Sequence, residues 1–255
     1  MKYDITSLTE ARPSRRSVTR AAAWSVPVIA VATSAPAFAA SCQPITGATM
    51  PIPASGTISN GGRDYALTYN PPANQYSDPV TMTIKAAYTG RMAPGSESQG
   101  VDLYTTFNPV GGLRTRGLGL VQTVTGSYAA PGRSARGVYT FSFTKPVTNL
   151  RFTLTDIDVL DGDYDDRIEI SNSGWTEVRA SRGAGVSGTG VQGDPWRGAG
   201  TYNDNTSSAG NVTIAFAGPV STFDLTYWNA MTSFSGVDRN QGVFLTNISF
   251  DYQPC

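Results

Sequence analysis

The stretch Val138-Tyr-Thr-Phe-Ser-Phe143 decides the fold, because an aromatic side chain recurs at every second residue. In an extended strand, successive side chains point to opposite faces, so Tyr139, Phe141 and Phe143 share one face. The same alternation recurs along the rest of the chain, in the stretches 65–69, 80–88, 118–125, 147–156, 167–170, 175–180, 211–216, 220–229 and 243–252. This period of two predicts about ten to twelve short strands.

The spacing of these strands predicts one all-β domain. The chain holds 27 glycines and 16 prolines, which divide the apolar stretches into short segments joined by turns. After the first forty residues, no window keeps an apolar stripe with the 3.6-residue period of a helix. We therefore expect an antiparallel β-sandwich of jelly-roll-like topology, formed as a single domain by residues 40–255.

The N-terminus reads as an export signal. Paired arginines at Arg15 and Arg16 precede an alanine-rich stretch, residues 21–32, and the small-residue motif Ala37-Phe38-Ala39. These features predict a twin-arginine signal peptide over residues 1–39, with general secretion as the alternative. A spanning helix needs about 20 apolar residues, and no stretch after residue 39 offers such a run, so no membrane insertion is expected after cleavage. We expect a secreted, extracellular protein, with a place at the cell surface also open.

The charged residues exclude several kinds of function. Residues 40–255 hold 14 basic and 17 acidic side chains, and the basic ones are scattered, so nucleic acid is not an expected partner. The chain has no histidine. A Ser-His-Asp triad, a Cys-His pair and a histidine-ligated metal centre are therefore excluded.

The two cysteines lie near the ends of the mature chain. Cys42 follows the expected cleavage site and Cys255 is the last residue. In an oxidising exterior, such a pair is most simply a disulfide that joins the chain ends. Lipidation of Cys42 is the alternative.

Six of the fifteen aspartates fall within the eleven residues 156–166, the densest concentration of charge in the chain. Alternation places Asp156 and Asp158 on the inward face of their strand, and Asp166 inward on the next strand. Carboxylates this close repel one another unless a cation or basic partners compensate them. Calcium accepts six to eight oxygens in flexible geometry. The pattern thus predicts a structural calcium site, with the ligands Asp156, Asp158, Asp161, Asp163 and Asp166.

An alternative interpretation of the aspartate run needs no metal. The run can form a hairpin loop of Asx-turns whose carboxylates pair with Arg151 and Arg167. Both interpretations stay open at the level of sequence.

The segment 149–170 carries a further signal. Its Thr155-Asp156-Ile157-Asp158 motif, followed by Asp166-Arg167, resembles a motif of twin-arginine-exported bacterial β-sandwich proteins, many of them actinobacterial and of unassigned function. The resemblance implies an exported, jelly-roll-like domain. It supplies no catalytic residues.

For function, the sequence favours a non-catalytic binding module for a glycan or another cell-surface ligand. Aromatic side chains offer flat apolar faces with a polar handle, and the candidates are Trp196, Tyr202, Trp228 and Tyr164. A structural surface or matrix component without a small ligand is the alternative. A carboxylate-based hydrolase or lyase is less favoured, because the three glutamates of residues 40–255 form no recognisable acid/base constellation.

Overall fold

The computed structural model describes residues 44–52, 56–72, 78–126, 132–172, 174–200, 203–235 and 239–254. The expected signal peptide, Cys42 and Cys255 lie outside these residues, so the predicted cleavage and disulfide stay predictions. Pro44–Cys255 forms one compact unit. Among the described residues, no helix has the length and apolar character needed to cross a membrane.

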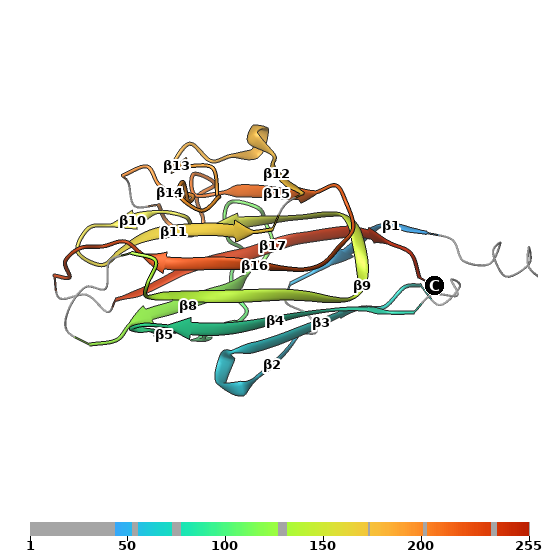
Figure 1. Ribbon diagram of the computed structural model, residues 1–255, viewed down its shortest axis with the longest axis horizontal. Helices are drawn as coiled ribbons and strands as arrows, with labels where there is room; N and C mark the ends of the chain where they lie inside the picture. The colour runs from blue at the N-terminus through green and yellow to red at the C-terminus, as the bar shows by residue number, and fades with distance from the viewer. Residues whose placement is uncertain are drawn as a thin grey trace, which may run out of the picture. The chain divides into compact units, whose positions relative to one another are not determined.

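Two antiparallel sheets form this unit (Figure 1). The first sheet runs in the order β10 (Val159–Leu160), β11 (Tyr164–Ser171), β16 (Val220–Asn229), the first half of β9 (Arg136–Thr155), β4 (Val80–Thr89), β3 (Asp64–Tyr69) and β2 (Thr57–Ser59). The second runs in the order β12 (Trp175–Glu177), β15 (Val212–Phe216), the second half of β9, β17 (Asn240–Tyr252), β8 (Leu118–Val124) and β5 (Met92–Pro94). β1 (Ile45–Met50) pairs with the end of β17.

The remaining short elements lie in the connecting segments. They are two small hairpins, β6 (Ser96–Glu97) with β7 (Gly100–Val101) and β13 (Val186–Ser187) with β14 (Arg197–Gly198), and two single-turn 3₁₀ helices, η1 (Asn60–Gly62) and η2 (Arg179–Ser181).

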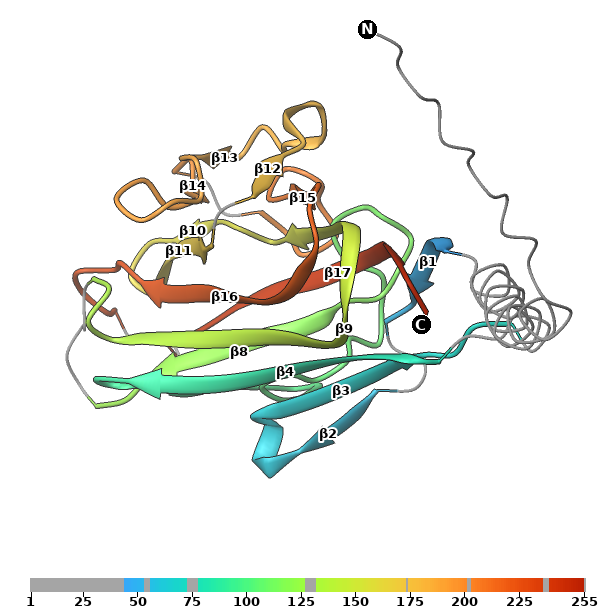
Figure 2. The same cartoon turned by 45° about the vertical axis from the view of Figure 1, so that its right-hand side comes forward.

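The 20-residue strand β9 belongs to both sheets. Up to Phe143 it pairs with β4 and β16, and from Val147 it pairs with β15 and β17. Figures 1 and 2 show its sharp bend between the two halves. Pro146 lies at the bend, where its missing N–H leaves no donor to lose from either ladder.

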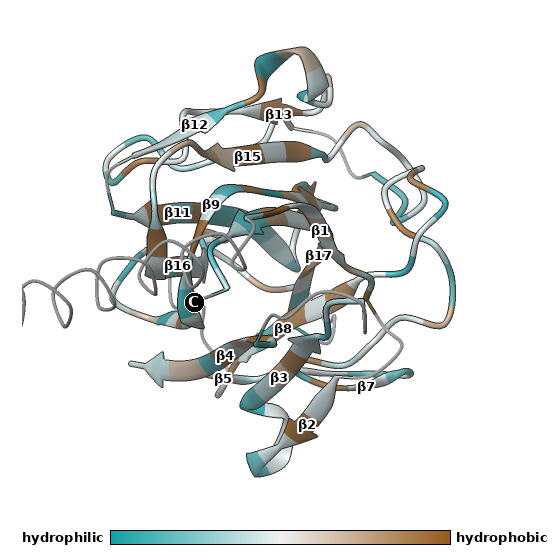
Figure 3. Cartoon of the chain, turned by 90° about the vertical axis from the view of Figure 1, so that its right-hand side faces the viewer, coloured by the Kyte–Doolittle hydropathy of each residue, from teal (hydrophilic) through white to brown (hydrophobic). Residues whose placement is uncertain are grey.

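The interior between the sheets is packed with aromatic rings. Phe223 and Phe141 of the first sheet stack at 4.5 Å between ring centroids, and Phe152 and Phe216 of the second sheet lie 5.6 and 5.1 Å from Phe223. All four rings are at most 2% exposed. In Figure 3, hydrophobic residues recur along strands such as β3 and β15.

The predicted all-β, antiparallel, jelly-roll-like sandwich is confirmed, since the long strands from β8 to β17 pass repeatedly between the two sheets, whereas β3 and β4 are neighbours in the first. The described residues form seventeen strands, nine of them with at least five residues. Two details differ from the sequence prediction. The stretches 138–143 and 147–156 are halves of one bent strand, and this strand ends at Thr155, because Asp156 has a left-handed backbone (φ 70°).

Candidate functional site

The segment between β7 and β8, residues 102–117, crosses the outer face of the second sheet. Tyr104 and Val110 of this segment pack against Val121 of β8 and Phe244 of β17, forming a small apolar cluster separate from the main core. Backbone hydrogen bonds from Gly119 to Tyr104 (2.8 Å) and from Thr106 to Gly117 (2.9 Å) hold the segment on the sheet. It thereby builds the walls of two adjoining pockets.

The first of these, here called the acidic pocket, has a volume of about 320 Å³. Its lining comes from five separate parts of the chain, within residues 97–104, 121, 156–164, 204–205 and 240–244, and includes Glu97, Tyr104, Asp156, Tyr164, Asp204 and Gln241. Burial, followed by the charges of Glu97 and Asp156, raises the pKa of Tyr104 to about 12. Three carboxylates and two phenol rings thus line one small cavity.

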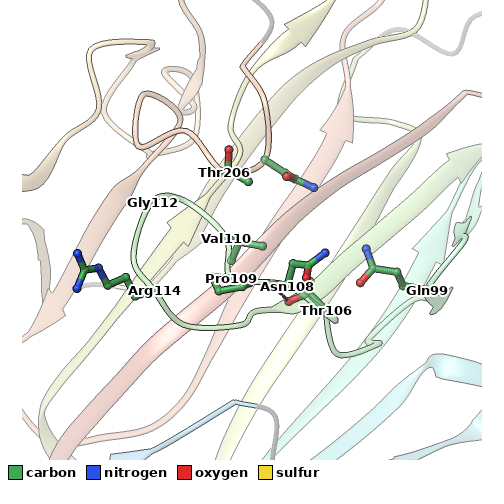
Figure 4. A pocket seen from close by; sticks show the side chains of 9 residues that line it. Gln99, Thr106, Asn108, Pro109, Val110, Gly112, Arg114 and Thr206 are labelled. Atoms are coloured by element: carbon green, nitrogen blue, oxygen red, sulfur yellow. Dashed lines mark hydrogen bonds between the residues drawn. The ribbon is translucent and has the colours of Figure 1, made fainter.

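The second, here called the Arg114 pocket, has a volume of about 460 Å³. Its lining includes Asn108, Arg114 and Thr206, and it shares Gln99 and Asn205 with the acidic pocket. Figure 4 shows Gln99 and Arg114 at opposite sides of it, with Thr206 contributed by a different loop. The shared residues make the two pockets neighbours along one surface.

Specific contacts hold the loop that carries Asp204 and Asn205 beside the aspartate run. Gly111 N donates to Asn205 O (2.8 Å), and Ile157 N donates to Gly210 O (3.1 Å). A β-carbon on Gly210 would lie only 2.7 Å from the nitrogen of Ile157, so a glycine is needed for this close approach. The approach brings Asp204 close enough to Asp156 for its charge to raise the pKa of Asp156.

Two side chains of the acidic pocket hold buried polar atoms that have no hydrogen-bond partner among the described residues. They are Oδ1 of Asp156 and both amide atoms of Gln241. Gln241 is only 2% exposed. Burial, followed by the charges of Asp158 and Asp204, raises the pKa of Asp156 well above its usual range. Buried polar groups normally have hydrogen-bond partners. A polar ligand would therefore gain most binding free energy by hydrogen-bonding to Asp156 and Gln241.

Two further aspartates of the run lie next to Asp156 but are already hydrogen-bonded. Asp158 accepts from the backbone N–H of Asn203 (2.6 Å), and Asp166 accepts from Asp158 N (3.2 Å) and from the hydroxyl of Tyr227 (2.6 Å). Burial raises the pKa of Asp158 to about 6, while burial and then the charge of Asp158 raise that of Asp166 well above its usual range.

The other two predicted calcium ligands have different surroundings. Asp163 accepts from the backbone N–H of Arg239 (3.0 Å), and Asp161 is exposed on the turn between β10 and β11. Within the described ranges, no three acidic side chains are grouped as a metal site requires. Calcium binding and the set of five ligands therefore both stay predictions. Arg167 pairs with Asp165, as the alternative interpretation of the run expects.

The aromatic candidates have different positions. Tyr164 is half-buried and lines the acidic pocket. Tyr202 lies outside the described residues. Trp228 is buried at 6% exposure.

Trp196 was expected at a ligand-accessible position, and this expectation is wrong. Its side chain is fully buried, lies tilted against Trp175 at 5.2 Å between ring centroids, and donates from Nε1 to Glu177 (3.2 Å). The backbone of Trp196 also exchanges hydrogen bonds with Ile168 of β11, so the glycine-rich segment extends the edge of the first sheet.

Sequence reasoning missed Phe107, the most exposed large hydrophobic side chain in the described structure at 64%. It lies between Thr106 and Asn108, which both line the Arg114 pocket. Its backbone N–H donates to Oε1 of Gln99 (2.6 Å) and so fixes a residue that both pockets share. The sequence signal that could have identified it is a phenylalanine outside any alternating apolar pattern. It stands directly before the turn residues Asn108-Pro109 and shortly before a Gly-Gly pair.

Comparisons with known proteins identify no close relative. No family model matches the chain and no curated protein matches it, so the resemblance drawn from the aspartate motif stays a prediction. A solved structure described as carbohydrate-binding modules of the β-sandwich superfamily covers 73% of this chain and 72% of its own, at 10% identity and a TM-score of 0.30. At that score, the likeness assigns neither a ligand nor a binding residue to this chain.

Proposed function

We propose that this protein is a carbohydrate-binding module that holds a glycan in the acidic pocket and the adjoining Arg114 pocket. One observation carries the proposal: Asp156 and Gln241 bring buried, unpartnered polar atoms to the wall of a 320 Å³ cavity that two tyrosines also line. Sugar hydroxyls both donate and accept hydrogen bonds, so they match carboxylate and amide groups arranged around a cavity.

The adjoining pocket supports a chain-like ligand rather than a single sugar. Gln99 and Asn205 line both pockets, so one ligand can contact both without leaving the surface. Phe107 offers an exposed ring beside the Arg114 pocket, and flat aromatic faces stack well on the apolar faces of sugar rings. A glycan bound in this way would have one unit in the acidic pocket and the next ones near Phe107.

The place of action is part of the proposal. The arginine pair and the alanine-rich stretch of residues 1–39 support export, which would bring the domain to extracellular or cell-surface glycans. A structural component of the surface remains the alternative function, and it would bind no oligosaccharide.

A glycan panel tests the proposal. Full-length protein should bind a subset of immobilised oligosaccharides, and Phe107→Ala should weaken that binding by roughly tenfold, as expected for the loss of a contact worth about 1.4 kcal/mol. Ile58→Ala is the matched control, since Ile58 is an exposed hydrophobic residue (45%) that lines neither pocket. Absence of binding across a panel of neutral, acidic and amino-sugar glycans would contradict the proposal.

The same mixtures of protein and oligosaccharide also test the alternative that the protein is a hydrolase. Three carboxylates line the acidic pocket, and glycoside hydrolysis generally uses two that flank the scissile bond. Mass spectrometry of the bound oligosaccharide after prolonged incubation should show an unchanged chain length. Shortened products, lost in Asp156→Asn, would make the protein an enzyme.

A further inference from the structure

The charge of the acidic pocket restricts the ligand. Its lining contains three carboxylates, Glu97, Asp156 and Asp204, and no lysine or arginine. The single basic side chain of the combined site, Arg114, belongs to the other pocket. An anionic sugar, such as a uronic acid or a sulfated unit, would therefore meet like charges in the acidic pocket.

A metal ion does not match this arrangement. No three acidic side chains of the described chain are grouped closely enough to hold one ion. Here the carboxylates are instead contributed by distant segments, near residues 97, 156 and 204, around a cavity of about 320 Å³. An organic cation matches such spacing better, because its charge is attached to a body that fills the space.

The unpartnered groups match the same ligand. Oδ1 of Asp156 is a buried acceptor, and the amide of Gln241 offers both a donor and an acceptor. An ammonium group has three donors and no acceptor, so it can satisfy carboxylates that a hydroxyl would satisfy only in part. A neighbouring hydroxyl of the same sugar can pair with Gln241.

We propose that the acidic pocket selects a glycan unit with a protonated amine, that is, a de-N-acetylated amino sugar. This inference rests on the proposed carbohydrate-binding function and names its ligand class. Asp156 is the principal partner of the amine, whose positive charge favours the ionised carboxylate. Glu97 and Asp204 add negative charge from other segments of the lining.

Three oligosaccharides that differ at one position of each sugar test the inference. Calorimetric titrations at pH 6 would compare β-1,4-linked oligomers of glucose, N-acetylglucosamine and glucosamine, which carry a hydroxyl, an acetamide and an ammonium group. The full-length chain should bind the glucosamine oligomer about tenfold or more tightly than the other two, because its hydrogen bond to carboxylate is charge-assisted. Added salt should weaken this preference.

Single substitutions test which side chain causes the preference for the glucosamine oligomer. Asp156→Asn should remove most of the preference for glucosamine, so that the three oligomers bind with more nearly equal affinity. Asp161→Asn is the matched control, since Asp161 is an exposed aspartate of the same run that lines neither pocket. Both variants would first be checked for an unchanged unfolding temperature, and Asp204→Asn provides a second test if Asp156→Asn unfolds.

The outcomes separate the two proposals. Equal binding of all three oligomers, or a preference that Asp156→Asn leaves intact, would overturn the amine inference while carbohydrate binding stands. A preference that disappears in chelator would also overturn it, because a metal would then be the cation. Binding of none of the three oligomers, together with a blank glycan panel, would overturn both.

Discussion

The interior of the sandwich has two halves that are held together differently. Along β9, the inward residues change from Phe143 and Phe141 to Tyr139, and along β16 they change from Phe223 to Tyr227. In the phenylalanine half, stacked rings from both sheets fill the space. In the tyrosine half, hydroxyl groups donate to two buried carboxylates, Asp102 directly after β7 and Asp166 on β11. Tyr104 and Tyr164, two residues from these carboxylates, line the acidic pocket.

The tyrosine half contains two carboxylate–phenol groups. Asp102 accepts from the hydroxyls of Tyr88 and Tyr139 and from the backbone N–H of Val121 (2.7 Å), while Asp166 accepts from Tyr227. Burial raises the pKa of Asp102 to about 7. The comparison teaches that close packing of rings stabilises one half, whereas the half nearest the site also depends on hydrogen bonds between buried polar groups.

The largest effect is expected in the phenylalanine half. Phe223→Ala removes the ring that contacts Phe141, Phe152 and Phe216, and should lower the free energy of unfolding by about 3–5 kcal/mol. Chemical denaturation measures this change, with Ile58→Ala as an exposed control that should change it by less than about 0.5 kcal/mol. A loss of less than about 1 kcal/mol in the free energy of unfolding of Phe223→Ala would mean that contacts among these rings do not stabilise the interior.

A smaller effect is expected in the tyrosine half. Tyr227→Phe keeps the ring but leaves Oδ1 of Asp166 without its donor, which should lower the free energy of unfolding by about 1–3 kcal/mol. The double variant Tyr227→Phe with Asp166→Asn should lose less than the sum of the single losses, because both changes act on one hydrogen bond. Strict additivity would contradict the pairing.

The comparison also predicts a pH dependence for the tyrosine half alone. An aspartate in the unfolded chain has a pKa of about 3.9, so between that value and about 7 the unfolded state releases a proton that folded Asp102 keeps. Raising the pH therefore favours unfolding, and the contribution of Asp102 should fall by about 1 kcal/mol between pH 6 and pH 7. Denaturation curves of the wild type and Asp102→Asn at both pH values measure the difference, which should be smaller in the variant. If the free energy of unfolding changes equally between the two pH values in the wild type and in the variant, the pH dependence belongs to other groups, such as Asp158.

The smallest effect concerns calcium. Asp158 and Asp166 already accept hydrogen bonds from the protein, so millimolar calcium should leave the unfolding temperature within about 1 °C of its value in chelator. Differential scanning fluorimetry decides this. A rise of several degrees that Asp156→Asn removes would establish the calcium site that the sequence predicts.

The sequence predicts the fold better than the site. Alternation located most of the long strands, because buried residues in a sandwich recur at every second position. It could not show that 138–143 and 147–156 form one strand, since the bend at Pro146 looks the same in sequence as a turn. It was also wrong on Trp196, whose burial depends on a contact with Ile168 far along the chain.

The site shows the same limit. The aspartate run drew attention to Asp156 because its charge density is visible in the sequence. Phe107, Gln99 and Gln241 join Asp156 only through pairings between distant segments, such as Gly111 with Asn205, and no local pattern encodes such pairings.

The bend of β9 has a mechanical consequence. One continuous backbone is hydrogen-bonded to β4 and β16 in one layer and to β15 and β17 in the other, so pulling on either layer loads the same strand. The layers cannot slide past each other while β9 is intact. The segment that begins after Thr155 and carries Asp156 is therefore anchored to a strand that both layers hold, which fixes this wall of the acidic pocket.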